Sequence, residues 1–131
     1  EQRACAVSDF NRDGKMDLAI GQNNAQTKLL LNSGGTAGIR VRLKGATQNP
    51  TAVGAKVTMK ITKNHTVTKE VQSGSGYWAV NSSVLVLPKL NQAHELTVAW
   101  PSGSEVSYNI PEGIREVLLQ ESGEATVLRA R

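Results

Sequence analysis

The feature of the sequence that most limits the possible folds is a series of short segments in which apolar and polar residues alternate. In residues 38–45, an isoleucine, a valine and a leucine occupy every second position, and basic residues lie between them. Residues 56–62 repeat this pattern with valine, methionine and isoleucine. A period of two is typical of a strand with one buried face. The short segment Lys63-Asn64-His65 then leads into β-prone residues 66–71, which predicts a hairpin.

The same signals continue towards the C-terminal end. Runs of β-forming residues, separated by Gly or Pro, cover 84–87, 95–100, 105–110, 115–121 and 125–129. Only residues 88–93 carry any helical signal. Hydrophobic residues make up 39% of the 131 residues, enough for one packed core, and aromatic residues only 4%, so the core must be mainly aliphatic. We therefore expect an all-β fold, either an antiparallel β-sandwich or an open barrel.

The N-terminal part has a different pattern. An acidic loop from Asp9 to Asp17 precedes a short apolar strand at 18–20 and a second one at 28–31. Such a hairpin is too small to be stable alone. The Gly-rich stretch 32–38 reads as a linker, so we place a domain boundary near residue 35, between units 1–35 and 36–131.

The acidic loop contains all three aspartates of the chain, in the pattern D-x-[D/N]-x-D-G-x-x-D. Calcium takes six to eight oxygen ligands, whereas magnesium demands a tighter octahedron. An EF-hand would need Glu where Ile20 stands. The pattern therefore predicts an EF-hand-like calcium loop in a β context, and the alternative is an Asx-rich turn without metal. The expected ligands are the backbone carbonyl of Lys15 and the side chains of Asp9, Asn11, Asp13 and Asp17.

Basic residues are segregated along the chain. The net charge is +4, but residues 18–69 carry eight basic groups and no acidic group. If strands 38–45 and 56–62 lie in one sheet, they form a basic face of Arg40, Arg42, Lys44, Lys56 and Lys60. Such a face would attract an acidic glycan or an acidic protein surface; the alternative is an ordinary solvated strand face. Aromatic residues are not interleaved with the basic ones, so we expect no nucleic-acid partner.

Two adjacent aromatic residues complete the candidate ligand-binding set. In a strand, one of Tyr77 and Trp78 would face the core and the other would be available to stack on a sugar. The candidate ligand-binding residues are Arg40, Arg42, Lys44, Tyr77 and Trp78.

Catalytic chemistry is not expected. His65, His94 and Cys5 read as surface or structural residues, because no convergent acid, base or nucleophile set accompanies them. No apolar run approaches the roughly 20 residues of a membrane-spanning helix, so no membrane insertion is expected. The oligomeric state is not predicted by any of these patterns.

Two family resemblances follow from these motifs. Residues 7–32 resemble the calcium loop and hairpin of an FG-GAP/VCBS-type β-propeller repeat, through Asp9-x-Asn11-x-Asp13-Gly14-x-x-Asp17-Leu18. Residues 38–121 resemble the ASPIC/UnbV domain. The matching pieces are the basic strand 39–45, the segment 49–57, Glu70–Tyr77 and Val98–Gly103.

The resemblances indicate where such a domain occurs, and which domains accompany it, more than they indicate a chemical reaction. In the repeat family the loop joins two strands of a blade and the ion holds its shape, and the second domain follows such repeats in extracellular proteins. We therefore expect a non-enzymatic, secreted or cell-surface calcium-binding module for adhesion or ligand recognition, forming the C-terminal part of a larger propeller protein. The start at Glu1 fits an excised piece. The alternative is a carbohydrate-binding accessory module of an enzyme whose catalytic domain lies elsewhere.

Overall fold

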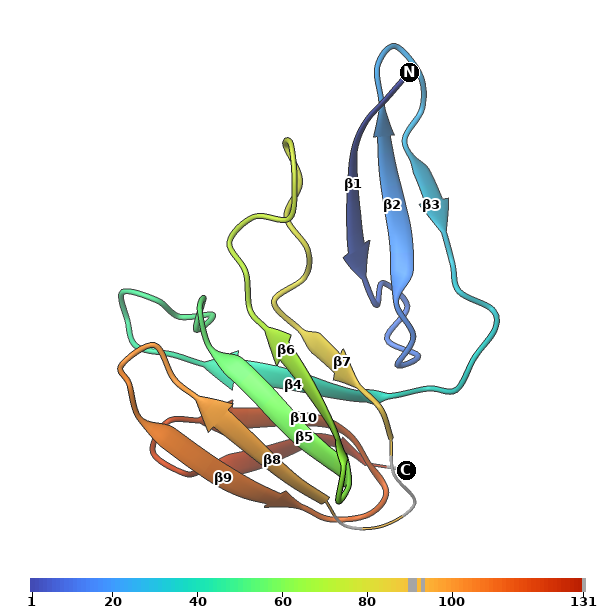
Figure 1. Ribbon diagram of the computed structural model, residues 1–131. Helices are drawn as coiled ribbons and strands as arrows, with labels where there is room; N and C mark the ends of the chain where they lie inside the picture. The colour runs from blue at the N-terminus through green and yellow to red at the C-terminus, as the bar shows by residue number, and fades with distance from the viewer. Residues whose placement is uncertain (90–91, 93, 131) are drawn as a thin grey trace.

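The computed structural model describes residues 1–89, 92 and 94–130, and in this part of the chain all regular structure is β (Figure 1). Three sheets are present. The first is antiparallel, with the order β1-β2-β3 and the strand bounds Gln2–Ser8, Asp17–Gln22 and Lys28–Leu30. None of the described segments is a helix of the length and apolarity needed to cross a membrane.

The other two sheets form a β-sandwich. One has the order β11-β10-β4-β7, with β4 at Ile39–Lys44, β7 at Leu85–Leu87, β10 at Ile114–Gln120 and β11 at Ala125–Ala130. The other has the order β6-β5-β8-β9, with β5 at Lys56–Thr62, β6 at His65–Glu70, β8 at His94–Ala99 and β9 at Glu105–Ile110. Figure 1 shows the two sheets facing each other. The expected all-β sandwich is therefore confirmed.

The core between these sheets is mainly aliphatic, as the composition predicted. The alternate residues Ile39, Val41 and Leu43 of β4 point inward and are buried. Val57 and Met59 of β5 lie in the same core with no exposed surface. The buried core residues all lie between positions 39 and 119, so the sandwich core is built without the first sheet.

The strands from residue 38 onward lie where the alternation predicts them, and each bound agrees within one residue. The predicted hairpin is the antiparallel pair β5–β6, which turns at Lys63 and Asn64. In the segment 88–93, residues 90, 91 and 93 lie outside the described residues; Pro88, Lys89 and Gln92 are not helical.

One strand pair departs from the expected antiparallel pattern. β4 and β10 run parallel, with Val41 opposite Val117 and Leu43 opposite Leu119. Parallel neighbours need a long connection, and here the connection from β4 to β10 passes through the other sheet. This pairing also places Arg40 directly opposite Glu116.

Strand β1 was not predicted from the residue pattern. Its sequence contains Ala4, Cys5 and Ala6 and only weak alternation, and it is at most half-buried. The strand exists because it pairs with β2, from Gln2 opposite Gln22 to Ser8 opposite Asp17. The acidic loop is thus the connection between two paired strands.

Candidate functional site

The acidic loop lies against the outer face of the sheet that contains β4 and β10, at the junction of the first sheet and the sandwich (Figure 1). The backbone of Gly14 accepts a 2.7 Å hydrogen bond from Gly38 N, just before β4 begins. Arg129 of β11 donates a 3.0 Å hydrogen bond to the carbonyl of Arg12. The loop therefore connects the two parts of the protein as well as turning the chain.

Two glycines make this close approach possible. Gly14 has a φ of +85°, and a Cβ atom there would lie 2.7 Å from Gly38 O. A Cβ atom on Gly38 would lie 2.3 Å from Leu87 O. A side chain at Gly14 would push the loop away from Gly38, and a side chain at Gly38 would clash with β7.

The loop is held by its own aspartates. Asp9 accepts hydrogen bonds from the backbone N–H groups of Asp13 at 3.0 Å and Gly14 at 2.8 Å. Asp13 accepts bonds from Lys15 N at 2.9 Å and from the Asn11 amide at 3.0 Å. These local bonds are typical of Asx turns, the arrangement that the metal-free alternative describes.

Asp17, like Asp9, is a buried aspartate of the loop. Its side chain accepts 2.8 Å hydrogen bonds from the backbone N–H groups of Asn32 and Phe10, and the residue is 2% exposed. The hydrogen bond from Asn32 is the largest influence on its pKa, which lies below the ordinary value although burial acts in the opposite direction. Among the described residues, no basic side chain forms an ion pair with Asp17. Backbone N–H groups, rather than an ion pair with a basic side chain, therefore stabilise the negative charge of Asp17.

The five expected calcium ligands all belong to this loop, and oxygen donors of this kind suit calcium. The three carboxylates among them are not gathered around one point, however. Within the described part of the chain, no group of three or more His, Cys, Asp or Glu side chains is arranged to hold a metal ion. The Asp9 carboxylate, moreover, forms an ion pair with Arg40. The loop thus has suitable donor chemistry without a ready-made coordination shell.

Three arginines surround the carboxylate of Glu116 on β10. The residue has no exposed surface, and its carboxylate lies 2.8 Å from Arg12 Nη2, 2.5 Å from Arg42 Nε and 3.3 Å from Arg40 Nε. Burial raises the pKa of Glu116, but hydrogen bonds from Arg12 and Arg42 and the charge of Arg40 outweigh it and lower the pKa to about 2. Neither Glu116 nor Arg12 was predicted to be a site residue; the one signal in the sequence was a glutamate directly before the apolar residues 117–119.

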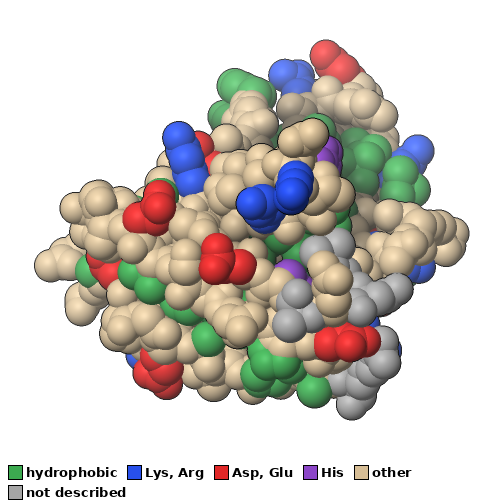
Figure 2. Space-filling view, turned by 60° about the horizontal axis from the view of Figure 1, so that its bottom comes forward, with side chains coloured by type: hydrophobic (Ala, Val, Ile, Leu, Met, Phe, Trp, Pro, Cys, Tyr) green, Lys and Arg blue, Asp and Glu red, His purple; other side chains and the backbone are tan. Residues whose placement is uncertain are grey.

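The prediction of one continuous basic face is wrong. β4 and β5 belong to different sheets, so their basic residues do not share one surface. Arg40 is only 4% exposed and is engaged with Asp9 and Glu116, while Lys44, Lys56 and Lys60 are exposed. On the face shown in Figure 2, basic and acidic side chains are scattered and do not form one continuous basic area.

The aromatic pair differs from expectation too. Tyr77 and Trp78 lie in a turn, not a strand, and both are exposed, by 65% and 85%. Their rings stack on each other with centroids 5.4 Å apart. Tyr77 also borders a cleft of about 360 Å³ formed with residues of β1 and β2, including Arg3 and Cys5.

The two histidines and the cysteine lie on separate strands. His65 is the exposed first residue of β6, whereas His94 is the buried first residue of β8. Cys5 is a free, exposed thiol on β1.

Comparison with known proteins identifies the sandwich. Residues 45–126 match the family model described as ASPIC and UnbV. This match covers more than half of the chain and starts at the end of β4. A comparison with curated proteins found no match.

Proposed function

Because the chain belongs to the ASPIC and UnbV family, we propose that it is a non-enzymatic, secreted or cell-surface module that binds calcium and recognises a ligand. The first sheet and its acidic loop would be the final part of an FG-GAP/VCBS-type propeller repeat, and the sandwich would carry the recognition surface. The scattered positions of His65, His94 and Cys5 support a binding role over a catalytic one.

The observation that carries the calcium proposal is the clustering of three carboxylates, one amide and one backbone carbonyl in a single nine-residue loop. Carboxylates so close in sequence repel one another, and a cation in the loop would offset that repulsion. Arg40 already balances Asp9, whereas no described basic side chain forms an ion pair with Asp13 or Asp17.

Binding would use Asp9, Asn11, Asp13, Asp17 and the carbonyl of Lys15. Calcium would compete with the Asn11 amide at Asp13 and with Arg40 at Asp9. We therefore expect modest affinity, on the order of the 10⁻⁴–10⁻³ M of extracellular calcium modules.

Calorimetric titration of the full chain with calcium chloride tests this proposal. One saturable site is expected, and Asp13→Ala should abolish the heat because it removes one of the proposed ligands. Since Asp13 is exposed, its loss leaves the buried contacts of the loop intact. The matched control is Glu112→Gln, which removes one exposed negative charge elsewhere and should bind like the wild type. Undiminished heat in Asp13→Ala would show that the loop is not the calcium site.

A second candidate function, a carbohydrate-binding accessory module of an enzyme, is favoured by the exposed aromatic pair. Tyr77 and Trp78 present stacked rings beside a cleft large enough for a sugar ring. A glycan array separates the candidates: selective binding that Trp78→Ala removes would support this function, and absence of selective binding would leave the first proposal.

A further inference from the structure

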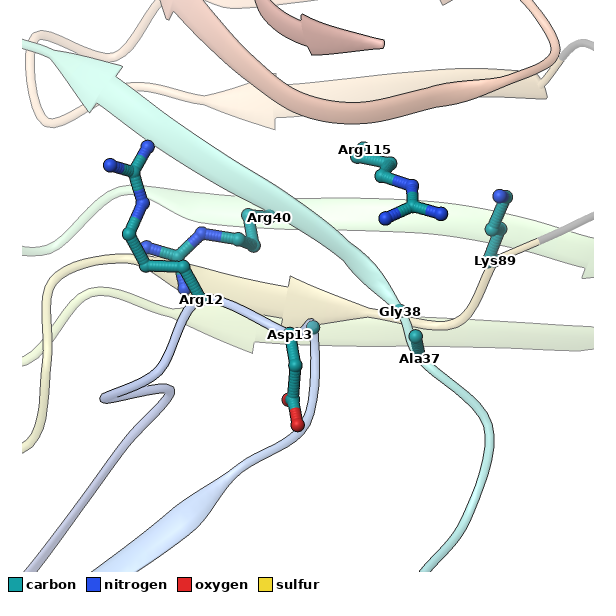
Figure 3. Close-up of a pocket in the computed structure, with 8 residues that line it drawn as sticks. Arg12, Asp13, Ala37, Gly38, Arg40, Lys89 and Arg115 are labelled. Carbon is teal, nitrogen blue, oxygen red and sulfur yellow. The ribbon is translucent and has the colours of Figure 1, made fainter. Parts of the chain in front are cut away.

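We propose that a small cavity beside the acidic loop binds a tetrahedral oxyanion, that is, a sulfate or phosphate group. The cavity has a volume of about 90 Å³. Four basic side chains from four different segments line it: Arg12 of the acidic loop, Arg40 of β4, Lys89 after β7 and Arg115 of β10. Figure 3 shows Arg12 and Arg40 on one side of the cavity and the charged ends of Arg115 and Lys89 on the other. The inference does not rest on calcium binding.

The charges around this cavity are not balanced by the protein. Glu116 and Asp9 are already engaged by three arginines. Asp13, the acidic residue that lines the cavity, points away from the arginines in Figure 3. The side chains of Lys89 and Arg115 form neither an ion pair nor a hydrogen bond with any described residue. Two cations on one wall without a partner repel each other, and an anion between them would remove that repulsion.

Arg40 lines the opposite side of the cavity, and its guanidinium is held in place. Its side chain is only 5% exposed, and Nη1 is held by the carboxylate and, at 3.3 Å, by the carbonyl oxygen of Asp9. Its Nε is buried and makes no hydrogen bond with a described residue, although Glu116 Oε2 lies 3.3 Å away. An arginine held in place by other contacts loses little conformational freedom when it binds an anion.

The size of the cavity and the directions of its donors select the ligand. A cavity of about 90 Å³ is small, and it suits one small oxyanion better than a whole sugar ring. Basic groups approach from opposite walls. This suits the oxygens of a tetrahedral ion, which point in four directions, better than the two coplanar oxygens of a carboxylate.

Calorimetric titration of the full chain with sodium sulfate and with sodium phosphate tests the inference. EDTA is present and ionic strength is held constant with sodium chloride, so the result is independent of calcium. We expect saturable 1:1 binding that the double variant Lys89→Gln/Arg115→Gln weakens at least tenfold. Neither residue contacts the Glu116 cluster, so the variant should keep the wild-type melting temperature.

The charge-matched control is Lys60→Gln/Lys63→Gln, which removes two exposed cations of the β5–β6 hairpin and should change the affinity less than twofold. Equal weakening in both double variants, or no saturable heat with the wild type, would overturn the proposal. A further titration with a sulfated oligosaccharide shows whether the anion is carried by a glycan or is a free ion. If the oligosaccharide binds at least tenfold tighter than sulfate, and Lys89→Gln/Arg115→Gln loses this binding, the anion is carried by a glycan; equal affinity of the two ligands indicates a free ion. Both results support the site.

Discussion

Arg40 and Glu116 lie opposite each other in the parallel register of β4 and β10, and Arg40 Nε is 3.3 Å from the Glu116 carboxylate. Both residues are on the outer face of the sandwich, yet both are buried, because the acidic loop covers them. The same arginine pairs with Asp9 of that loop. These ion pairs join the N-terminal sheet to the sandwich of the family domain.

Removing the carboxylate of Glu116 should destabilise the protein. Glu116→Gln leaves three arginines around a buried position without its negative charge, and loss of one partner of a buried ion pair typically costs about 3–5 kcal/mol. Urea unfolding measures the difference. The control Glu112→Gln, on an exposed residue, should change the free energy of unfolding by less than about 0.5 kcal/mol. Equal, small effects would show that the cluster contributes nothing to stability.

The lowered pKa of Glu116 predicts that the stability of the protein falls at acid pH. The pKa of Glu116 is about 2 in the folded protein and 4.5 ordinarily, so the unfolded chain takes up a proton first as the pH falls. Its stabilising contribution is complete above about pH 4.5 and is lost as the pH falls from there towards 2. The lowered pKa of Asp17 acts in the same direction. Urea unfolding from pH 6 to pH 3 should show a steeper loss of stability for the wild type than for Glu116→Gln; parallel curves would contradict the assignment.

Deleting residues 1–32 should leave a folded but weaker sandwich. The core lies wholly between positions 39 and 119, so we expect a cooperative thermal transition. The deletion also removes Asp9 and Arg12, which uncovers Arg40 and Glu116, so the transition should occur at a lower temperature than in the full chain. Calorimetric melting distinguishes this from a non-cooperative transition, which would make the first sheet an integral part of the fold.

The close packing of Gly38, the residue before β4, against β7 can be tested by substitution. In Gly38→Ala the new methyl group would meet Leu87 O at 2.3 Å and Val86 Cγ1 at 2.7 Å, and such overpacking typically costs about 1–3 kcal/mol. Gly74→Ala is the control, because nothing lies within 4 Å of a Cβ atom there. If the two variants unfold at the same urea concentration, the close packing around Gly38 does not contribute to the stability of the protein.

The sequence was sufficient to predict the sandwich because alternation marks which side chains of a strand face a core. It correctly put Arg40 on the side of β4 away from the core. Alternation does not show what covers the outer face, so the burial of Arg40 and the role of Glu116 could not be foreseen. The parallel pairing of β4 with β10 joins segments more than 70 residues apart, and no local pattern encodes it.

The candidate site was predicted unevenly for the same reason. The nine-residue spacing in the acidic loop is local, so its aspartates could be identified from the sequence. The cavity lined by Arg12, Lys89 and Arg115 depends on three segments that only the fold brings together. The assumption that β4 and β5 share a sheet failed because both strands fit either sheet equally well by pattern.

NMR titration of the ¹⁵N-labelled full chain with calcium chloride tests the proposed calcium site most directly, because it reports each backbone amide. We predict saturable shifts, at 1:1 stoichiometry and below about 10 mM calcium, for the amides of residues 9–17 and of Asn32, which bonds Asp17. The amides of the β5–β6 turn at Lys63 and Asn64 should not move. No saturable shift in the acidic loop would contradict the proposal that this protein is a calcium-binding module.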